Sequence, residues 1–243
     1  MGKPTREYIY GINPAFEVLR GGRRSIYTAF MADTMAGNPR LTKLATLLEA
    51  RKIPVERVEK RRLHQLCTSK EHQGVVLRTN TYAYAHVEKI LEANRVLLLD
   101  NVEDPYNVGA ILRCAEVFGF HDVLLPAKGV PDIYPSVVKI SAGATEHLRI
   151  AKEQSANEHA KAAKKLGYTI IALDAAGQVD VRDLHGRHID KMLLVIGGEA
   201  AAVDPFILQE ADHVARIGQH GRLNSLNASV AAGIAMFALA GSA

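Results

Sequence analysis

The sequence predicts an α/β protein with two parts: a small N-terminal α/β sandwich, and a larger C-terminal, mostly parallel sheet with helices on both faces. In residues 95–243, short apolar segments alternate with longer segments whose apolar residues recur at helical spacing. Parallel strands need a crossover connection, usually a helix, so this alternation is typical of a parallel sheet covered on both faces. Ligands of such sheets bind beyond the carboxyl ends of the strands.

The N-terminal part, residues 1–78, alternates helix and strand patterns on a smaller scale. Asn13 is expected to cap a helix that has Pro14 in its first turn and runs to about Arg20. A second helix is expected over 38–51, where leucines and an alanine form one apolar face. Strands are expected at 26–31, 54–58 and 74–78. The polar, irregular residues 79–94 predict a linker, with a short amphipathic segment at 87–93.

The C-terminal part, residues 95–243, carries the stronger alternation. Strands are expected at 96–99, 123–125, 148–150, 169–173, 193–196 and 213–217. Helices are expected at 108–118, 134–140, 158–166, 204–211 and 226–239. This order predicts that the loops following the strands meet at one edge of the sheet, where a ligand would bind.

The charge is unevenly distributed along the chain. Residues 1–94 hold 16 Lys and Arg against 9 Asp and Glu, a net of +7, whereas residues 95–243 hold 14 against 17, a net of −3. Two clusters stand out, one with Arg23 and Arg24 and one with Arg61 and Arg62. Basic groups of this kind contact nucleic-acid phosphates, which give affinity without sequence information. A solvated basic face without a ligand explains the charge equally well.

Several classes of protein are disfavoured. No apolar run reaches membrane-spanning length and no secretory signal is recognisable, so we expect a cytoplasmic protein. Cys67 and Cys114 have no ligand partners at metal-binding spacing and are expected to be ordinary thiols, with no metal bound. No glycine-rich dinucleotide fingerprint, Walker loop or nucleophile elbow is present.

Three segments after predicted strands carry candidate chemistry. In the first, Asn107 is expected to cap the helix that starts at Val108, and Arg113, six residues on, leans back toward the helix start. The two side chains could border one site. The alternative is a capped amphipathic helix with a surface arginine.

The second segment is Gly197-Gly198-Glu199, in which paired glycines let backbone amides approach a ligand. An acid in this place is often only the cap of the next helix. The third segment places Ser225 and Asn227 among more polar residues than one helix cap requires. The surplus predicts that Ser225 and Asn227 face a ligand.

Taken together, these segments resemble the SpoU-type (TrmH family) branch of the knotted SPOUT RNA 2′-O-ribose methyltransferases. The resemblance rests on Asn107-Val-Gly-Ala-Ile with Arg113, on Ile196-Gly-Gly-Glu, and on Ser225-Leu-Asn-Ala-Ser-Val-Ala-Ala, in this order. In the N-terminal part, Gly11-Ile-Asn-Pro and His72-Gln-Gly are similar to the substrate domain of the bacterial 23S rRNA guanosine-2′-O-methyltransferase subgroup.

The resemblance implies a deep trefoil knot in residues 95–243, a homodimer, and an RNA substrate-binding domain in residues 1–78. It implies that S-adenosyl-L-methionine binds at Leu173, Gly197, Gly198, Ile217 and Leu226. It also implies that Arg113 acts at the ribose 2′-hydroxyl in a site shaped by Asn107, Glu199, Ser225 and Asn227. The residues expected to bind RNA are Arg23, Arg24, Arg61, Arg62, His72 and Gln73.

Arginine keeps its proton at ordinary pH, so we expect Arg113 to position RNA and stabilise developing charge rather than to act as a base. The chain departs from the family pattern at Ala202, where glycine is usual, and at Gly218, where proline is usual. Both changes are expected to weaken cofactor binding. Ribosomal RNA is the favoured substrate, tRNA is the nearest alternative, and a non-catalytic RNA-binding protein with the same fold is a third reading.

Overall fold

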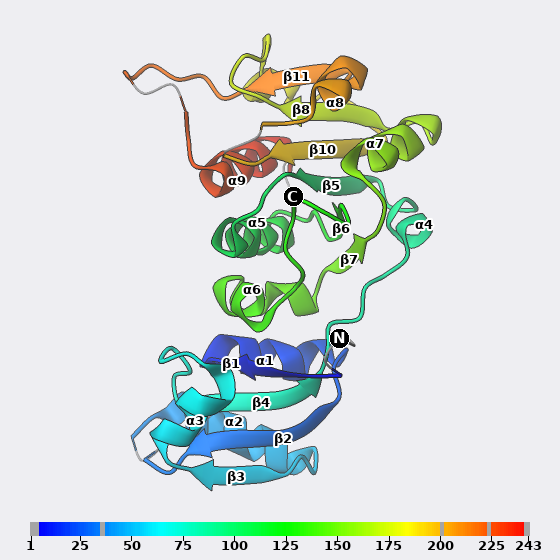
Figure 1. The fold of residues 1–243 in the computed structure, drawn as a ribbon. Coiled ribbons are helices and arrows are strands. Elements are labelled where there is room, and N and C mark those ends of the chain that lie inside the picture. The colour runs from blue at the N-terminus through cyan, green and yellow to red at the C-terminus, as the bar shows by residue number, and fades with distance from the viewer. Residues whose placement is uncertain (1–4, 35–36, 200–201, 223–224, 241–243) are drawn as a thin grey trace. The chain divides into compact units, whose positions relative to one another are not determined.

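The computed structural model describes residues 5–34, 37–199, 202–222 and 225–240, and the chain divides into two compact units (Figure 1). Unit 1 consists of residues 1–83 together with 133–147, and unit 2 consists of 84–132 together with 148–243. The first boundary falls within the stretch expected to be a linker, 79–94. The sequence pattern did not predict that 133–147 belongs with the N-terminal part.

Unit 1 is built on a four-stranded sheet of order β1-β4-β2-β3, in which only the β2–β3 pairing is parallel. Its elements are β1 (Arg6–Tyr10), α1 (Ile12–Gly21), β2 (Ile26–Ala32), α2 (Pro39–Ala50), β3 (Val55–Val58), α3 (Lys60–Cys67), β4 (Val75–Asn80), α6 (Pro135–Ile140) and the 3₁₀ helix η1 (Ala144–Glu146). The three predicted strands are present. The sequence reading missed β1 and α3.

The start of α1 differs from the prediction that Asn13 caps it. The helix begins at Ile12 after Gly11, whose φ of 99° suits glycine. The Ile12 N–H donates to Gln73 Oε1 at 3.0 Å, and Asn13 instead accepts a bond from Arg40. The first N–H of α1 is therefore satisfied by a side chain 61 residues away, which no local pattern could indicate.

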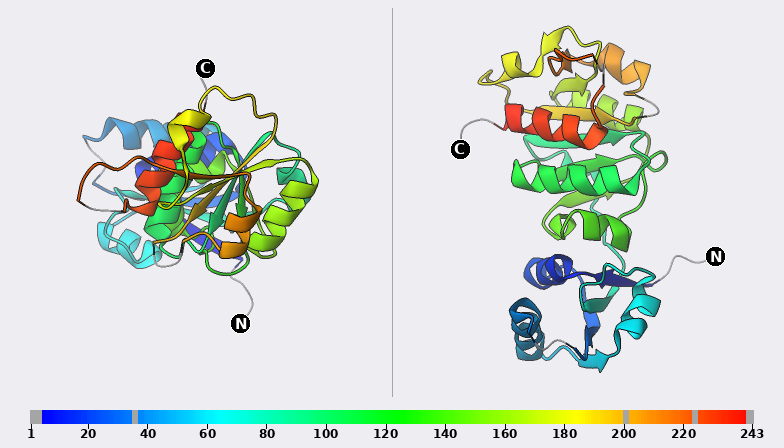
Figure 2. Two further views of the ribbon diagram at one scale, coloured as in Figure 1. Left: turned by 90° about the horizontal axis from the view of Figure 1, so that it is seen from above. Right: turned by 90° about the vertical axis from the view of Figure 1, so that its left-hand side faces the viewer.

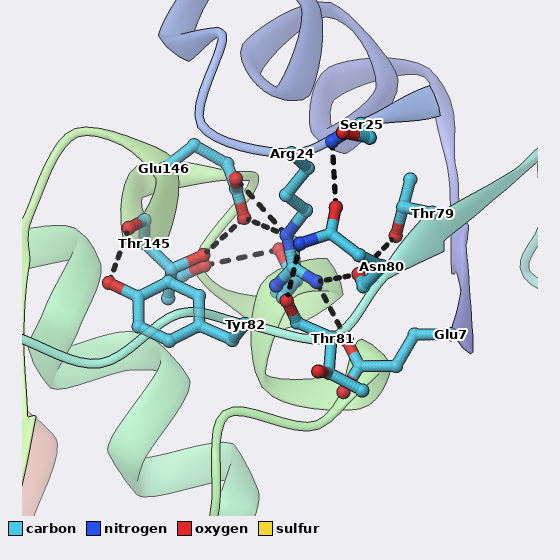
Figure 3. Close-up of polar contacts among 11 residues, drawn as sticks. Glu7, Arg24, Ser25, Thr79, Asn80, Thr81, Tyr82, Thr145 and Glu146 are labelled. Atoms are coloured by element: carbon cyan, nitrogen blue, oxygen red, sulfur yellow. Dashed lines mark hydrogen bonds and ion pairs between the residues drawn. The ribbon is translucent and has the colours of Figure 1, made fainter. Parts of the chain in front are cut away.

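The segment 133–147 is held in unit 1 by a buried set of polar contacts that we call the Arg24 cluster: Arg24, Glu7, Glu146 and Tyr82 (Figure 3). Arg24 Nε donates to both carboxylate oxygens of Glu146, at 3.0 and 3.2 Å, and Arg24 Nη1 donates to Glu7 at 2.7 Å. Tyr82 lies under the guanidinium and donates to the Thr145 carbonyl. Two carboxylates thus compensate one buried cation and join segments 122 residues apart.

In the described residues, unit 2 forms a seven-stranded sheet of order β7-β6-β5-β10-β8-β11-β9, and every pairing is parallel. Its elements are α4 (Val87–Ile90), β5 (Arg95–Asp100), α5 (Pro105–Val117), β6 (Asp122–Leu125), β7 (Arg149–Lys152), α7 (Ala156–Lys165), β8 (Thr169–Leu173), β9 (Val179–Asp180), the 3₁₀ helix η2 (Val181–Leu184), β10 (Met192–Gly197), α8 (Pro205–Glu210), β11 (His213–Arg216) and α9 (Ala228–Leu239). The predicted parallel sheet is confirmed, and all six predicted strands are present.

Helices cover both faces of this sheet, as Figures 1 and 2 show. α4, α7 and α8 pack on one face, where Ile90, Ala160 and Ile207 share a core with Leu98 and Val195 of the central strands. α5 and α9 lie side by side on the other face. They approach closely because α9 carries Gly233, at which a Cβ would lie 3.3 Å from Cys114 Sγ. Both faces of the central strands are buried, which explains their continuous apolar sequences.

The strand order places a topological switch between β5 and β10. From β5 the chain moves to β6 and β7 on one side, and it later places β10, β8 and β11 on the other. The last residues of the two central strands, Asp100 and Gly197, are paired in register. The loops carrying the first two predicted motifs therefore leave the sheet next to each other, where open α/β sheets bind ligands.

Candidate active site

The site begins at the first turn of α5, and its cap is not the predicted residue. Asp104 caps the helix, since its side chain accepts from the Tyr106 N–H at 3.0 Å, and Pro105 is the first helical residue. The prediction that Asn107 is the cap is wrong by one turn. As a result, the Asn107 side chain is not engaged with its own backbone. It is buried and contacts two other loops.

These contacts define the Asn107 cluster, which consists of Asn107, Glu199 and Asn227. Asn227 Nδ2 donates to Asn107 Oδ1 at 3.0 Å and to Glu199 Oε1 at 2.5 Å. Asn107 Nδ2 lies 3.4 Å from the same Glu199 oxygen. Three side chains from three predicted motifs, separated by 92 and 120 residues from Asn107, thus close a small polar triangle.

Asn227 is fully occupied within the protein. Its Oδ1 accepts from the N–H groups of Ser229 and Val230 and so caps α9. Both Nδ2 bonds go to the cluster. Asn227 therefore positions Glu199 and has no free donor of its own for a ligand. Ser225 is exposed and lines a pocket beside the cluster. Asn224 lies outside the residues that the structure describes.

A pocket of about 380 Å³ adjoins the Asn107 cluster at the carboxyl ends of β8 and β10. Its wall is mostly aliphatic, and its polar members are Asp174, Glu199, Gln219 and Ser225. All five residues predicted to bind the cofactor lie on it: Leu173, Gly197, Gly198, Ile217 and Leu226. The second and third predicted motifs and the end of β8 thus line one cavity, and the first motif adjoins it through the contact of Asn107 with Glu199.

The pocket also contains residues that the sequence reading did not single out. Asp174, Ala175 and Ala176 follow β8, and Gln219 lies in the loop after β11. Asp174-Ala-Ala-Gly is a turn-like sequence directly after an apolar strand. This position could have indicated that these residues line a ligand site. Ala202, one of the two departures from the family pattern, lies on the same wall.

Gly197 is required by the loop itself. A Cβ at this position would lie 2.5 Å from the Val203 nitrogen and 2.7 Å from the Ala202 carbonyl carbon, both of which are backbone atoms. The chain therefore folds back against the end of β10 without room for a side chain. Gly197 was expected to let a ligand approach the backbone. In the structure the space beside Gly197 is occupied by the returning main chain, which forms one wall of the pocket.

A buried carboxylate supports the same edge of the sheet. Asp100, the last residue of β5, accepts a hydrogen bond from the Asp204 N–H at 2.8 Å and so ties β5 to the start of α8. Burial raises the pKa of Asp100 above its ordinary value. This contact fixes the far end of the loop that begins with Gly197.

The Arg113 side chain is not bonded to the Asn107 cluster. Arg113 is exposed on α5, and its side chain makes no hydrogen bond or ion pair with any other residue that the structure describes. Helical spacing places Arg113 on one stripe with Tyr106, Ala110 and Val117. Tyr106 and Val117 are 65% and 64% exposed, so this stripe of α5 faces away from the core.

The residues predicted to bind RNA separate into two groups. Arg23, Arg61, Arg62 and Gln73 are exposed in unit 1. Arg24, in contrast, is buried and paired with two carboxylates in the Arg24 cluster. His72 is also buried and accepts the Gly74 N–H at Nδ1. The assignment of these residues to RNA stays a prediction.

The described residues contain neither a membrane-spanning helix nor a metal-binding group of side chains. No helix there combines the length and apolar character needed to cross a bilayer. No group of three or more His, Cys, Asp or Glu side chains there could hold a metal ion.

Comparison with known proteins identifies the family. A model described as the SpoU rRNA methylase family matches residues 94–237, and one described as RNA 2′-O ribose methyltransferase substrate binding matches residues 8–85. A Bacillus subtilis (strain 168) protein named as a TrmH family tRNA/rRNA methyltransferase, YacO, is 30% identical over 95% of this chain and 94% of its own length. A protein of Mycolicibacterium gilvum, named an uncharacterized tRNA/rRNA methyltransferase, is 31% identical over 96% of this chain and 76% of its own length.

Solved structures agree with this result. The AdoMet-bound rRNA methyltransferase from Sinorhizobium meliloti superposes with a TM-score of 0.77 at 26% identity, covering 96% of this chain and 86% of that one. The AviRb methyltransferase from Streptomyces viridochromogenes shares the fold, with a TM-score of 0.79 at 21% identity over 97% of this chain and 90% of that one. The predicted family is thereby confirmed: the chain belongs to the SpoU rRNA methylase family of RNA methyltransferases.

Proposed function

We propose that this protein methylates a ribose 2′-hydroxyl of 23S rRNA with S-adenosyl-L-methionine as the methyl donor. The observation that carries the proposal is one cavity lined by all five predicted cofactor residues and bordered by the Asn107 cluster. When bound, S-adenosyl-L-methionine supplies a methyl group on a positively charged sulfur, which an oxygen nucleophile can attack.

The cavity fits this cofactor by its chemistry and size. Leu173, Ile217 and Leu226 offer apolar surface to an adenine ring, and the backbone at Gly197 and Gly198 offers hydrogen-bonding groups. Its volume of about 380 Å³ lies within the range of small-molecule sites. The S. meliloti relative, which is described as AdoMet-bound, supports the same assignment.

The Asn107 cluster holds the Glu199 carboxylate at the rim of the cavity. Because Asn227 and Asn107 both point at Oε1, the carboxylate is fixed in one orientation. Oε2 makes no hydrogen bond within the described residues and is free to accept one from a ribose hydroxyl. We assign Glu199 to orienting the 2′-hydroxyl and the two asparagines to positioning Glu199.

Arg113 is assigned to the RNA. As a permanent cation it can hold a phosphate and stabilise negative charge that develops on the 2′-oxygen. Its exposure and lack of partners among the described residues suit a group that awaits a ligand.

We further propose a homodimer formed through α5 and α9. The exposed stripe of α5 carries Tyr106 and Val117, and α9 exposes Val230, Ile234 and Phe237, the last at 70%. Phe118 at the end of α5 contacts Phe237, so the two stripes adjoin. An apolar patch of this kind marks an interface, and a second copy would cover it and enclose Arg113. The trefoil knot stays a prediction from the resemblance.

The choice of rRNA rests on domain content and charge. The S. meliloti rRNA methyltransferase matches both units of this chain. The basic N-terminal part, with Arg23, Arg61 and Arg62 exposed, supports its assignment as an RNA platform. We propose that the protein acts in the cytoplasm, where its rRNA substrate would be found.

The test is transfer of a labelled methyl group from S-adenosyl-L-methionine to 23S rRNA and, separately, to total tRNA. We expect label in a 2′-O-methylated nucleotide of 23S rRNA, with transfer lost in Asn107→Ala and Arg113→Ala and kept in the surface control Lys165→Gln. Transfer to tRNA alone would replace the substrate. No transfer and no cofactor binding by calorimetry would leave an RNA-binding protein that retains the fold.

A further inference from the structure

A second pocket at the same edge of unit 2 is lined by positive charge. It has a volume of about 480 Å³ and is formed where η2 meets the loop after β11. Three arginines, Arg182, Arg216 and Arg222, and His220 line it, against a single carboxylate, Asp180. This local excess of positive charge contrasts with residues 95–243 as a whole, which carry a net charge of −3. Such a local reversal of sign attracts an anion.

Two of these arginines are oriented by hydrogen bonds within the protein. Asp180 accepts from Arg182 Nε and Nη2, both at 2.9 Å, which fixes the guanidinium and leaves Nη1 outside the pair. Arg216 Nη1 donates to the Gly177 carbonyl at 3.2 Å. In the part of the chain that the structure describes, Arg216 and Arg222 have no carboxylate partner. Two of the three guanidinium groups are thus uncompensated.

Gly218 fits the chain around this pocket. A Cβ there would lie 2.9 Å from Asp180 Oδ2 and 3.1 Å from Arg182 Nη2, so a side chain at this position would require the Asp180 and Arg182 side chains to shift. Bonds from Arg182 and from the Gly218 N–H hold the pKa of Asp180 below its ordinary value. The departure from the family pattern at Gly218 thus lies directly beside the Asp180–Arg182 pair.

The basic pocket adjoins the cofactor cavity, since Ala175, Ile217 and Gln219 line both. We propose that it binds a phosphate of the RNA backbone close to the ribose that is methylated. The inference rests on the proposed function for the identity of the ligand as RNA. A phosphodiester suits several guanidinium groups around one cavity, and its attachment to the target ribose explains why the two cavities are neighbours.

The test uses the full-length protein, protein-free 23S rRNA and filter binding over a range of KCl concentrations. The variants are Arg222→Gln and the double variant Arg216→Gln/Arg222→Gln. Lys165→Gln is the matched control, because the end of α7 lies at the opposite edge of the sheet from the strand carboxyl ends. S-adenosyl-L-methionine affinity is measured on every variant by calorimetry.

We expect the double variant to lose RNA affinity on the order of tenfold. The slope of log affinity against log salt should fall by about 0.7 per lost phosphate contact. The control should match the parent, and cofactor affinity should be unchanged. Unchanged RNA affinity and salt slope in the double variant would overturn the proposal. A loss of cofactor affinity with RNA binding intact would overturn it too, by assigning the pocket to the cofactor's carboxylate.

The same experiment separates this inference from the proposed function. If the parent protein transfers methyl groups and the double variant does so with an unchanged KM for RNA, only the phosphate pocket is refuted. If the parent transfers none but the double variant still loses RNA affinity and salt slope, the pocket stands and the proposed reaction fails.

Discussion

The Arg24 cluster in unit 1 and the Asn107 cluster in unit 2 both join segments about ninety or more residues apart, yet they differ in burial. The Arg24 and Glu146 side chains are 2% and 0% exposed, and two carboxylates compensate the cation. In the Asn107 cluster only Asn107 is buried, while Glu199 and Asn227 reach the surface beside a cavity.

This difference separates structural polar groups from functional ones. A buried charge must be paired, and a guanidinium enclosed with its carboxylates is not accessible to a ligand from solvent. An exposed carboxylate held by two amides keeps an oxygen available and is oriented without being enclosed. The Arg24 cluster has the stronger ionic contacts, whereas exposure of a carboxylate beside a cavity favours the Asn107 cluster as the site.

The largest effect is expected for Arg24→Met. It leaves Glu146 buried without its cation, and breaking a buried pair from one side typically costs about 3–5 kcal/mol of folding free energy. Urea unfolding followed by circular dichroism measures this loss. Arg61→Met, an exposed change of the same kind, should cost little. A loss near that of the control would show that the Arg24 cluster does not hold unit 1 together.

Gly197→Ala tests the wall of the cavity. The new methyl group meets backbone atoms of Ala202 and Val203, so the loop must move, at a cost of about 1–3 kcal/mol. We expect S-adenosyl-L-methionine affinity to fall on the order of tenfold by calorimetry. Gly221→Ala is the control, because a Cβ there meets nothing within 4 Å. Equal cofactor affinity in both variants would remove Gly197 from the cavity wall.

The helices and strands that the sequence predicted best are those whose buried residues form a visible local pattern. The strands around β5 and β10 were predicted because both faces are apolar, and apolar runs are visible in the sequence. β1 was missed because Arg6–Tyr10 is half exposed, and α3 because Lys60–Cys67 is polar. Helix caps were misplaced where several candidates lay within one turn, as with Asp104 and Asn107.

The candidate site was predictable for a topological reason, and its surroundings were not. Parallel strands end at one edge, so motifs that follow strands converge there, as Asn107, Glu199 and Asn227 do. The burial of Arg24 depends on Glu146, a residue brought in by a distant segment. The basic pocket likewise combines η2 with the loop after β11, and only the fold shows that they meet.

Asn227 separates stability from function within the Asn107 cluster. Asn227→Ala removes the cap of α9 and should cost about 1 kcal/mol. Asn227→Asp keeps a capping oxygen but sets a second carboxylate against Glu199, so folding should be largely kept. We expect both variants to lose methyl transfer on the order of 10²-fold, because Glu199 is no longer oriented. Full transfer by Asn227→Asp would make the cluster structural only.

The smallest expected effect is a pH-dependent change in folding stability caused by His159 on α7. His159 is a buried polar group inside unit 2 and so extends the comparison. His159 is fully buried, and burial lowers its pKa below the ordinary value of 6.5. Below pH 6.5 the unfolded chain therefore takes up a proton that the folded chain resists, and stability falls by at most about 1.4 kcal/mol per pH unit.

The measurement is urea unfolding of the parent and of His159→Asn at pH 7.5 and pH 5.5. The variant is expected to be less stable at pH 7.5, because it disturbs a packed site, and the gap should narrow at pH 5.5, where only the parent carries the histidine penalty. A gap that is constant or widens toward acid would mean that His159 can be protonated inside the fold. In that case, burial would not be enough to keep a polar group of this protein from being protonated.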